Sequence, residues 1–553
     1  MKKFFKYSVS LCLIWLMSAA CSKDFLDIDP QDRLTADNFY KNATEIKAGT
    51  ASLYGFPWFD FDDKFAWLAG DVMSGNMYYT YDQEGQFFFF SFNEGNAYLS
   101  SGWRGLFRVV SYANSLINDM PRAAQGKVDE RIINEALGEA RFIRGMAYFM
   151  LAEYWGEVPI VENSTELVSN NQLLLPKNTR ASVYELVRRD FAFAAENLPS
   201  SDVPGRVTKW SAKGMLAKLH LTMAQNLNDA KSGENFAKAR ELAEEVISTS
   251  GLSLLPNYAD LFKIDNNNNQ ESLFALQWME GAYAIGNSRQ ANWARSSVIT
   301  GNSECWGGGK CASYDLVQSI EPNDRRRSAI FMTGGDHYPE IRKAEGGYTY
   351  ELVLRDPNDP NITLEGAAPV LNNIKKYIVG SAEDTDGRVS TGQATALNQY
   401  ILRLADVYLI YAEAALGAGG STSDGKALQY FNAVRNRAGL ASKSSITFLD
   451  ILQERRVEFA MESNFWFDIK RYYYRDPSAA LAMLNAQQRE ITYQRITTPN
   501  APDENSFDGY QILPPAGPIV ISASQIQMPI PASEVVANPM LAPSAPAVDY
   551  DFQ

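Results

Sequence analysis

The sequence predicts a mainly α-helical protein, in which pairs of helices stack on one another and a large part of the chain forms loops. Three observations lead to this fold class. Apolar residues recur at helical spacing over most of the chain. Two distant segments share one spacing of small and apolar residues. Two long stretches, at about 56–100 and 251–395, keep no helical period and are rich in turn-forming residues.

The first residues have the parts of a secretory leader. Three lysines precede an apolar run, residues 7–17, that is too short to span a membrane. The small residues Ser18, Ala19 and Ala20 then lead into Cys21, a pattern that resembles a bacterial lipobox. We therefore expect a lipoprotein signal peptide at 1–20, a lipid on Cys21, a polar tether at 21–34 and one domain at 35–553. The alternative is an ordinary signal peptide with a chance cysteine.

The charge balance argues against nucleic acid as a partner. Removing residues 1–20 removes three lysines, which leaves 48 basic and 65 acidic residues and a net charge of −17. Binding to nucleic acid depends on Lys and Arg side chains that neutralise phosphates. The hydrophobic share, 46%, is that of a globular protein.

Helices are expected through much of the first 250 residues. One helix, capped by Thr35 or Asp37, runs to about residue 54, and others cover 102–119, 128–154 and 182–197. Residues 56–100 interrupt this pattern, because their aromatic residues are interleaved with Gly and Asp. We expect irregular structure there.

Two segments have the spacing of a repeated helix pair. Each is followed by a Gly-containing polar loop and a second helix, expected at 236–249 and at 426–438. The arrangement resembles tetratricopeptide helix-turn-helix units, which bury their apolar faces by stacking. The matching positions are Ala217, Leu221 and Ala224 in the first segment and Ala405, Leu409 and Ala412 in the second.

Two regions are expected to be mostly irregular. Residues 251–395 contain runs of Asn, Asp and Pro that form turns, with a short strand at 271–278. From about residue 473 the chain is Pro-rich, with a last helical turn starting at 530–534. Between these regions, charged residues spaced three and four apart predict ion pairs that link helices; they are Glu454, Arg455, Arg456, Glu458, Glu462, Asp468, Lys470 and Arg471.

Catalytic and metal-binding motifs are scarce in the sequence. His220 lies on an apolar helix and His337 in a turn, and neither completes a Ser-His-Asp or Cys-His arrangement. We expect no enzyme activity, no cofactor and no zinc. A calcium loop starting at Asp384 fails because its fifth position is Arg388. Asp356, Asn358 and Asp359 leave a structural calcium ion possible but unsupported.

Aromatic residues in flexible, polar surroundings are the positive indication of function. A flat ring stacks on the C–H face of a sugar, and nearby polar groups bind the hydroxyls. The alternative is that each ring folds back onto the helical body. The candidate ligand-binding residues are Tyr79, Tyr81, Tyr283, Trp293 and Trp306, with Asp71 and Asn76 as polar partners.

Cys305 and Cys311 flank a Gly-rich loop that carries Trp306. An exported protein meets conditions that permit disulfides, so the two thiols either form a bridge or stay free. The sequence gives no Cα separation that decides between these states.

Several segments along the chain form a set of motifs in a fixed order. They are FLD at 25–27, GEARFIRGMAYF at 138–149 with YWGEVP at 154–159, ILRLADVYL at 401–409 with AEA at 412–414, NAVRNRAGL at 432–440, ERRVEF at 454–459, and PIP at 529–531 with Glu534 and Asn538-Pro539. Together these motifs resemble those of the SusD/RagB family. One departure is ESNFWFD at 462–468, where many members have Gly-His or Gly-Lys-Arg before the Trp.

The resemblance implies an outer-membrane lipoprotein at the cell surface that binds glycans. Such a protein has a SusD-like fold, with tetratricopeptide-like helix pairs and a loop-rich ligand-binding face. It captures oligo- or polysaccharide without catalysis and delivers it to a TonB-dependent SusC-like transporter. The resemblance further implies that Arg403, Arg435 and Glu454 hold helices together, and that Tyr81, Tyr283 and Trp306 contact the glycan.

Two other functions stay open at this point. The first is capture of peptides, as in RagB-like uptake proteins. The second is a surface glycoside hydrolase, which needs only two carboxylates at a set distance. With 65 acidic residues, the sequence does not exclude such a pair.

Overall fold

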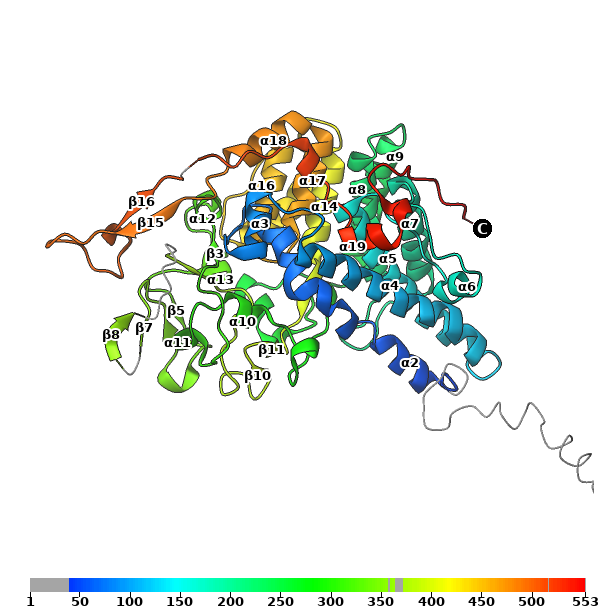
Figure 1. The fold of residues 1–553 in the computed structure, drawn as a ribbon, viewed down its shortest axis with the longest axis horizontal. Helices are drawn as coiled ribbons and strands as arrows, with labels where there is room; N and C mark the ends of the chain where they lie inside the picture. The colour runs from blue at the N-terminus through cyan, green and yellow to red at the C-terminus, as the bar shows by residue number, and fades with distance from the viewer. Residues whose placement is uncertain (1–38, 357–358, 364–370, 516, 553) are drawn as a thin grey trace, which may run out of the picture.

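The computed structural model describes residues 39–356, 359–363, 371–515 and 517–552. Within them, a body of long helices lies beside a region of short helices and two-stranded ladders (Figure 1). The predicted mainly helical fold is therefore confirmed. The predicted signal peptide, Cys21 and tether lie outside the described residues, as do Thr35 and Asp37. No helix in the described part of the chain is long and apolar enough to cross a membrane.

The first helices of the body appear close to their predicted positions. α2 (Ala43–Ala51) is shorter than expected and is capped by Asn42, whose side chain accepts from the Glu45 N–H. α4 (Ala97–Ala124), α5 (Glu130–Trp155) and α7 (Arg180–Asn197) follow, with the short α6 (Ser164–Ser169) between the last two. α5 packs between α4 and α7, and most of its second half is buried. This burial explains its nearly continuous apolar sequence.

Both predicted helix pairs are present. α8 (Lys209–Asn226) packs on α9 (Ser232–Thr249), and α14 (Leu404–Leu416) packs on α15 (Gly425–Arg437). α14 also contacts α8 and α9, so the two pairs stack, as tetratricopeptide-like units do. The predicted small and apolar positions of α8 and α14 are buried.

Residues 56–100 are more regular than predicted. They form η2 (Phe56–Trp58), the π-helical turns η3 (Phe61–Phe65) and η4 (Leu68–Val72), β1 (Met77–Tyr78) and α3 (Asp82–Phe89). The π turns bond i to i+5, which breaks the 3.6-residue period. Most of the aromatic residues in this segment point into the core. The Gly and Asp residues between them hid this pattern in the sequence.

The end of the chain also contains one helix that the prediction missed, after two that carry the predicted ion pairs. α16 (Phe448–Glu458) and α17 (Phe465–Arg475) are followed by α18 (Pro477–Ala486). Asp476 caps α18 and Pro477 is its first residue, so an Asp-Pro pair within the segment predicted to be irregular starts a helix. β15 (Thr492–Arg495) and β16 (Tyr510–Leu513) then form a hairpin that projects from the body (Figure 1). α19 (Ala532–Ala537) matches the last predicted turn.

Residues 251–395 are loop-rich, as predicted. β2 (Ser272–Leu276) is the expected strand and pairs with β12 (Gln399–Arg403) in an antiparallel ladder. The remaining elements are short helices and two-residue to five-residue strands; those used below are α10 (Arg289–Trp293), β3 (Cys311–Ala312), β5 (His337–Tyr338) and β6 (Tyr348–Thr349).

The two histidines and the Asp384 turn behave as structural features. His220 is partly buried on α8, and its Nδ1 lies 2.8 Å from Asn235 Oδ1; burial lowers its pKa. His337 is exposed in β5 beside Thr349 of β6. Asp384 accepts backbone hydrogen bonds from Lys343 and Ser381, so its carboxylate organises a turn.

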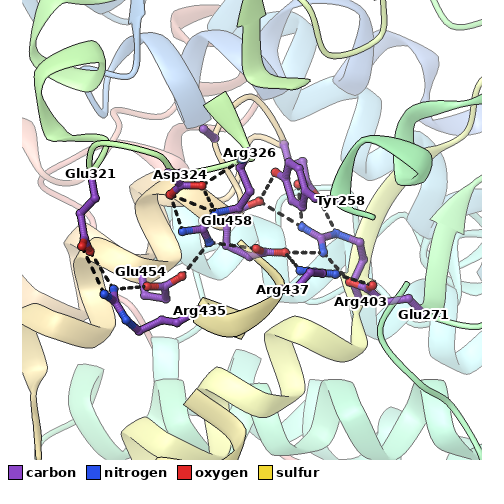
Figure 2. A network of polar contacts seen from close by, with 12 residues as sticks. Tyr258, Glu271, Glu321, Asp324, Arg326, Arg403, Arg435, Arg437, Glu454 and Glu458 are labelled. Carbon is purple, nitrogen blue, oxygen red and sulfur yellow. Dashed lines mark hydrogen bonds and ion pairs between the residues drawn. The ribbon is translucent and has the colours of Figure 1, made fainter. Parts of the chain in front are cut away.

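A buried network of guanidinium and carboxylate groups joins the helical body to the loop region (Figure 2). Arg403, at the end of β12, donates to Glu271 (2.7 Å) and to Glu458 (2.9 Å), and also to Glu462 (2.8 Å). Arg326 donates to Glu454 at 2.6 Å and to Glu458 at 3.1 Å. Burial alone would raise the pKa of Glu458, but three arginines outweigh it and hold the pKa well below its usual range.

The predicted ion pairs between helices are therefore confirmed. Arg435 of α15 contacts Glu454 of α16. Arg455 of α16 contacts Asp406 of α14 and Asp468 of α17, and Arg471 contacts Glu413 of α14. Lys470 is an exception, because its ammonium donates to the Glu153 main-chain carbonyl and the Gln527 amide.

Replacing Arg403 by Met should unfold the protein under much milder conditions. The Arg403 side chain is 1% exposed, and its loss removes a cation that three buried carboxylates share. We expect a loss of about 3–5 kcal/mol in unfolding free energy, measured by denaturant titration. The control is Arg131→Met, which removes an exposed i,i+4 pair with Glu135 and should cost less than about 1 kcal/mol. Equal effects of the two variants would contradict the role given to Arg403.

Candidate functional site

Three of the predicted aromatic residues are exposed to solvent. Tyr81 is 74% exposed, Trp306 50% and Tyr283 48%. Large aromatic side chains are rarely left this open without a use when they gather on one face. Their surroundings show how each ring is held.

Tyr283 is fixed by a carboxylate. Its hydroxyl donates to Asp63 Oδ2 at 2.7 Å, and its ring packs edge-on against Phe59 with centroids 4.7 Å apart. Asp63 also accepts from Ser288 Oγ at 2.5 Å. Burial and then Asp63 raise the pKa of Tyr283, so the phenol stays protonated and keeps donating. One side of the ring is thus anchored while the other faces solvent.

A second tyrosine–carboxylate pair lies on α3 and α4. Tyr98 of α4 donates its hydroxyl to Glu84 Oε1 of α3 at 3.0 Å, and Lys64 of η3 donates to the same oxygen at 2.9 Å. Burial and Glu84 raise the pKa of Tyr98. Tyr81 immediately precedes α3. The most exposed tyrosine of the described residues therefore lies at the start of the helix that carries Glu84.

The Trp306 loop is held by main-chain contacts. Trp306 N–H donates to Ala291 at 2.6 Å, and Gly307 N–H donates to Ala294 at 2.8 Å. A Cβ on Gly307 would lie 2.3 Å from the Trp293 carbonyl, so only glycine fits there. The loop rests closely on α10, and the indole of Trp306 remains half exposed.

Lys310 connects the loop to the tyrosine pair. Its Nζ donates to the Trp306 carbonyl at 3.2 Å, lies 3.8 Å from Glu84 Oε2, and is 4.2 Å from the centre of the Tyr79 ring. Segments 63–64, 79–98 and 283–310 are thereby joined through polar contacts. We call Tyr81, Tyr98, Tyr283 and Trp306 the aromatic face.

Four of the predicted ligand residues lie in the interior, which corrects their assignment. Trp293 is fully buried and packs edge-on against Trp67. Asp71 accepts from the Met461 and Ser463 N–H groups, both at 2.9 Å, and so ties η4 to the segment between α16 and α17. Asn76 accepts from Arg456, and Tyr79 lies under Lys310. Trp293 and Tyr79 thus contact the Trp306 loop and Lys310 from the interior, whereas Asp71 and Asn76 contact residues 456–463.

The two cysteines are free thiols, so the possible disulfide is not formed. Cys311 is buried in β3, which pairs with β1. The Cys305 thiol lies 3.3 Å from Thr300 Oγ1 and donates to the Asn302 carbonyl. The loop is closed by the hydrogen bond from Lys310 N–H to the Gly307 carbonyl instead.

The chemistry of the aromatic face is that of binding. Its rings offer apolar contact, and the partly exposed Asp63 and Lys64 offer hydrogen-bond partners for hydroxyl groups. Asp71, whose pKa burial raises to about 6, is enclosed and does not reach a substrate. The residues that the structure describes contain no cluster of His, Cys, Asp and Glu suited to hold a metal ion.

Comparison with known proteins identifies the family. The model of the SusD family matches residues 225–545, and a model described as "Starch-binding associating with outer membrane" matches residues 24–221. A SusD-like protein of Bacteroides ovatus is 37% identical over 97% of both chains. The chain belongs to the SusD family. A SusD-like protein of Formosa agariphila, P2, is 26% identical over 84% of this chain and 90% of its own.

Solved structures agree with this assignment. One, described as a crystal structure with xylogluco-oligosaccharide, has a TM-score of 0.80 and 36% identity, and the match covers 92% of this chain and 99% of that one. A laminarin-binding SusD-like protein shares the fold, with a TM-score of 0.66, 21% identity, and 90% and 98% coverage. The SusD-like fold expected from the sequence is confirmed.

The sequence missed Tyr98, Asp63, Glu84 and Lys310. Tyr98 fell at the end of the segment predicted to be irregular, whereas it lies in the first turn of α4. The three charged residues lie far apart in the chain, so only the folded structure shows that they share partners.

The structure predicts opposite roles for two tryptophans. Trp293→Ala should cost about 3–5 kcal/mol of unfolding free energy, because it empties a fully buried site. Trp306→Ala should change that free energy by less than about 1 kcal/mol, because half of the indole is already in water. Denaturant titration of both variants checks this, and a reversed order would show that the two side chains have been misplaced.

Proposed function

We propose that this protein captures an oligo- or polysaccharide on the aromatic face and delivers it, without catalysis, to a TonB-dependent SusC-like transporter. The observation that carries the proposal is the set of exposed rings of Tyr81, Tyr283 and Trp306, of which Tyr283 is held by Asp63 and the Trp306 loop by main-chain contacts. Rigid rings give contact area at little entropic cost, which suits recognition of a sugar. A lipid on Cys21 would hold the protein at the outer-membrane surface.

The relatives support a glycan as the ligand. The structure at 36% identity is described with xylogluco-oligosaccharide. The family model for residues 24–221 is described as starch-binding and associated with the outer membrane. A xylogluco-oligosaccharide is therefore the first ligand to test, and laminarin is a suitable comparison glycan.

Trp306→Ala and Tyr283→Ala should each weaken glycan binding by about tenfold or more, because each removes a stacking surface. Isothermal titration calorimetry with xylogluco-oligosaccharide measures the dissociation constant. Tyr112→Ala is the matched control, since Tyr112 is an exposed tyrosine on α4 that lies about 21 Å along the helix from Tyr98.

Three outcomes would contradict the proposal. If the control weakens binding as much as the two test variants do, the site is misplaced. If the wild type binds no glycan but binds peptides tightly, peptide capture replaces glycan capture. If the purified protein releases products from a glycan, the non-catalytic role is wrong.

A further inference from the structure

A buried lysine contacts the main chain of Trp306, whose indole is exposed. The side chain of Lys310 is 2% exposed, which is rare for a lysine because burial removes its hydration. Its ammonium donates to the Trp306 carbonyl and sits between the Tyr79 ring at 4.2 Å and the Trp67 ring at 5.6 Å. Both rings attract a cation through their faces.

Glu84 supplies the opposite charge. Its Oε1 accepts from Tyr98 and Lys64, whereas its buried Oε2 has no hydrogen-bond partner within the described residues. Lys310 Nζ stands 3.8 Å from Oε2, which is too far for a direct hydrogen bond but close for two charges. The ammonium is therefore held between the carboxylate on α3 and the carbonyl that precedes the Gly-rich run.

We propose that Lys310 is a positioning residue, whose ammonium, held by Glu84, fixes the Trp306 carbonyl and so sets where the indole meets the glycan. This inference rests on the proposed function. The neutral amine loses its attraction to Glu84 and to the two rings, so its hold on the Trp306 carbonyl weakens while the main-chain contacts of the loop remain. Binding at Trp306 becomes dependent on the charge of Lys310.

The surrounding groups place this charge change at a measurable pH. Burial lowers the pKa of Lys310 to about 8, with Glu84 opposing the change and Lys64 adding to it. The tyrosines that face it, Tyr79 and Tyr98, have raised pKa values and stay neutral through this range. Lys310 is thus charged at pH 7 and neutral well above pH 8.

Deprotonation of Lys310 does not unfold the protein. Its pKa in the folded chain lies below the ordinary lysine value of 10.5, so between about pH 8 and 10.5 the unfolded chain binds more protons. The contribution of Lys310 to stability therefore increases with pH in that window. A fall in glycan binding between about pH 8 and 10.5 therefore reflects a change at the binding site and not a loss of stability caused by Lys310.

The test is calorimetry of the mature chain with xylogluco-oligosaccharide from pH 7 to 9.5. The wild-type association constant should fall roughly fivefold, the value of one lost charge-assisted contact, with a midpoint near pH 8. Lys310→Arg should keep its affinity across the range, because a guanidinium stays charged. Lys310→Met should bind weakly at every pH.

Two further variants report on Lys310 without replacing it. Glu84→Gln removes the charge that favours the ammonium, so the midpoint should move to lower pH. Lys64→Gln removes a neighbouring positive charge, so the midpoint should move to higher pH. Shifts of the binding midpoint in opposite directions identify the titrating group as one that both Glu84 and Lys64 influence. The test therefore stays valid even if Lys310→Met does not fold.

The outcomes separate the two claims. Wild-type binding that is constant from pH 7 to 9.5, or midpoints that do not shift in opposite directions, overturns the positioning role and leaves glycan capture intact. Absence of glycan binding at every pH overturns the proposed function, and the positioning role with it.

Discussion

The buried contacts of Arg403 and Glu458 are the constraint on which the rest of the structure depends. Arg403 ends β12, immediately before α14, and Glu458 ends α16, so their ion pair joins two helices of the body. Glu271 and Arg326 extend the network into the loop-rich region. A buried charge that loses its partner costs several kcal/mol, so each member holds the others in place. Long loops are thereby attached to a rigid helical support.

This support has a direct consequence for the aromatic face. The residues that carry it come from irregular segments, which are usually the most mobile parts of a domain. Here the segments are tied at their bases by Asp71, by Lys310 and by the glycine contact of the Trp306 loop. Rings that are fixed before a ligand binds lose little conformational entropy on binding. This favours affinity for a ligand that makes few strong contacts, such as a sugar.

The sequence predicted the helical body well and the candidate site in part. α5, α7 and the pairs α8–α9 and α14–α15 bury faces with a regular period, which a sequence displays directly. The π turns of 61–72 do not keep that period, so they were predicted as irregular. Trp293 looked exposed because its neighbours in the sequence are polar, yet its ring packs against Trp67. The Asp71 carboxylate was assigned to a ligand, yet it accepts from the Met461 and Ser463 N–H groups in the interior. Such burial depends on segments distant in sequence. Tyr81, Tyr283 and Trp306 remain exposed because no segment that the structure describes covers them.

A crystal structure of the protein with a bound xylogluco-oligosaccharide tests the central claim most directly. The account predicts that sugar rings lie against Tyr81, Tyr283 and Trp306, with hydroxyl groups bonded to the polar side chains between them. A sugar bound elsewhere on the molecule, with these three rings still in contact with solvent, would contradict it.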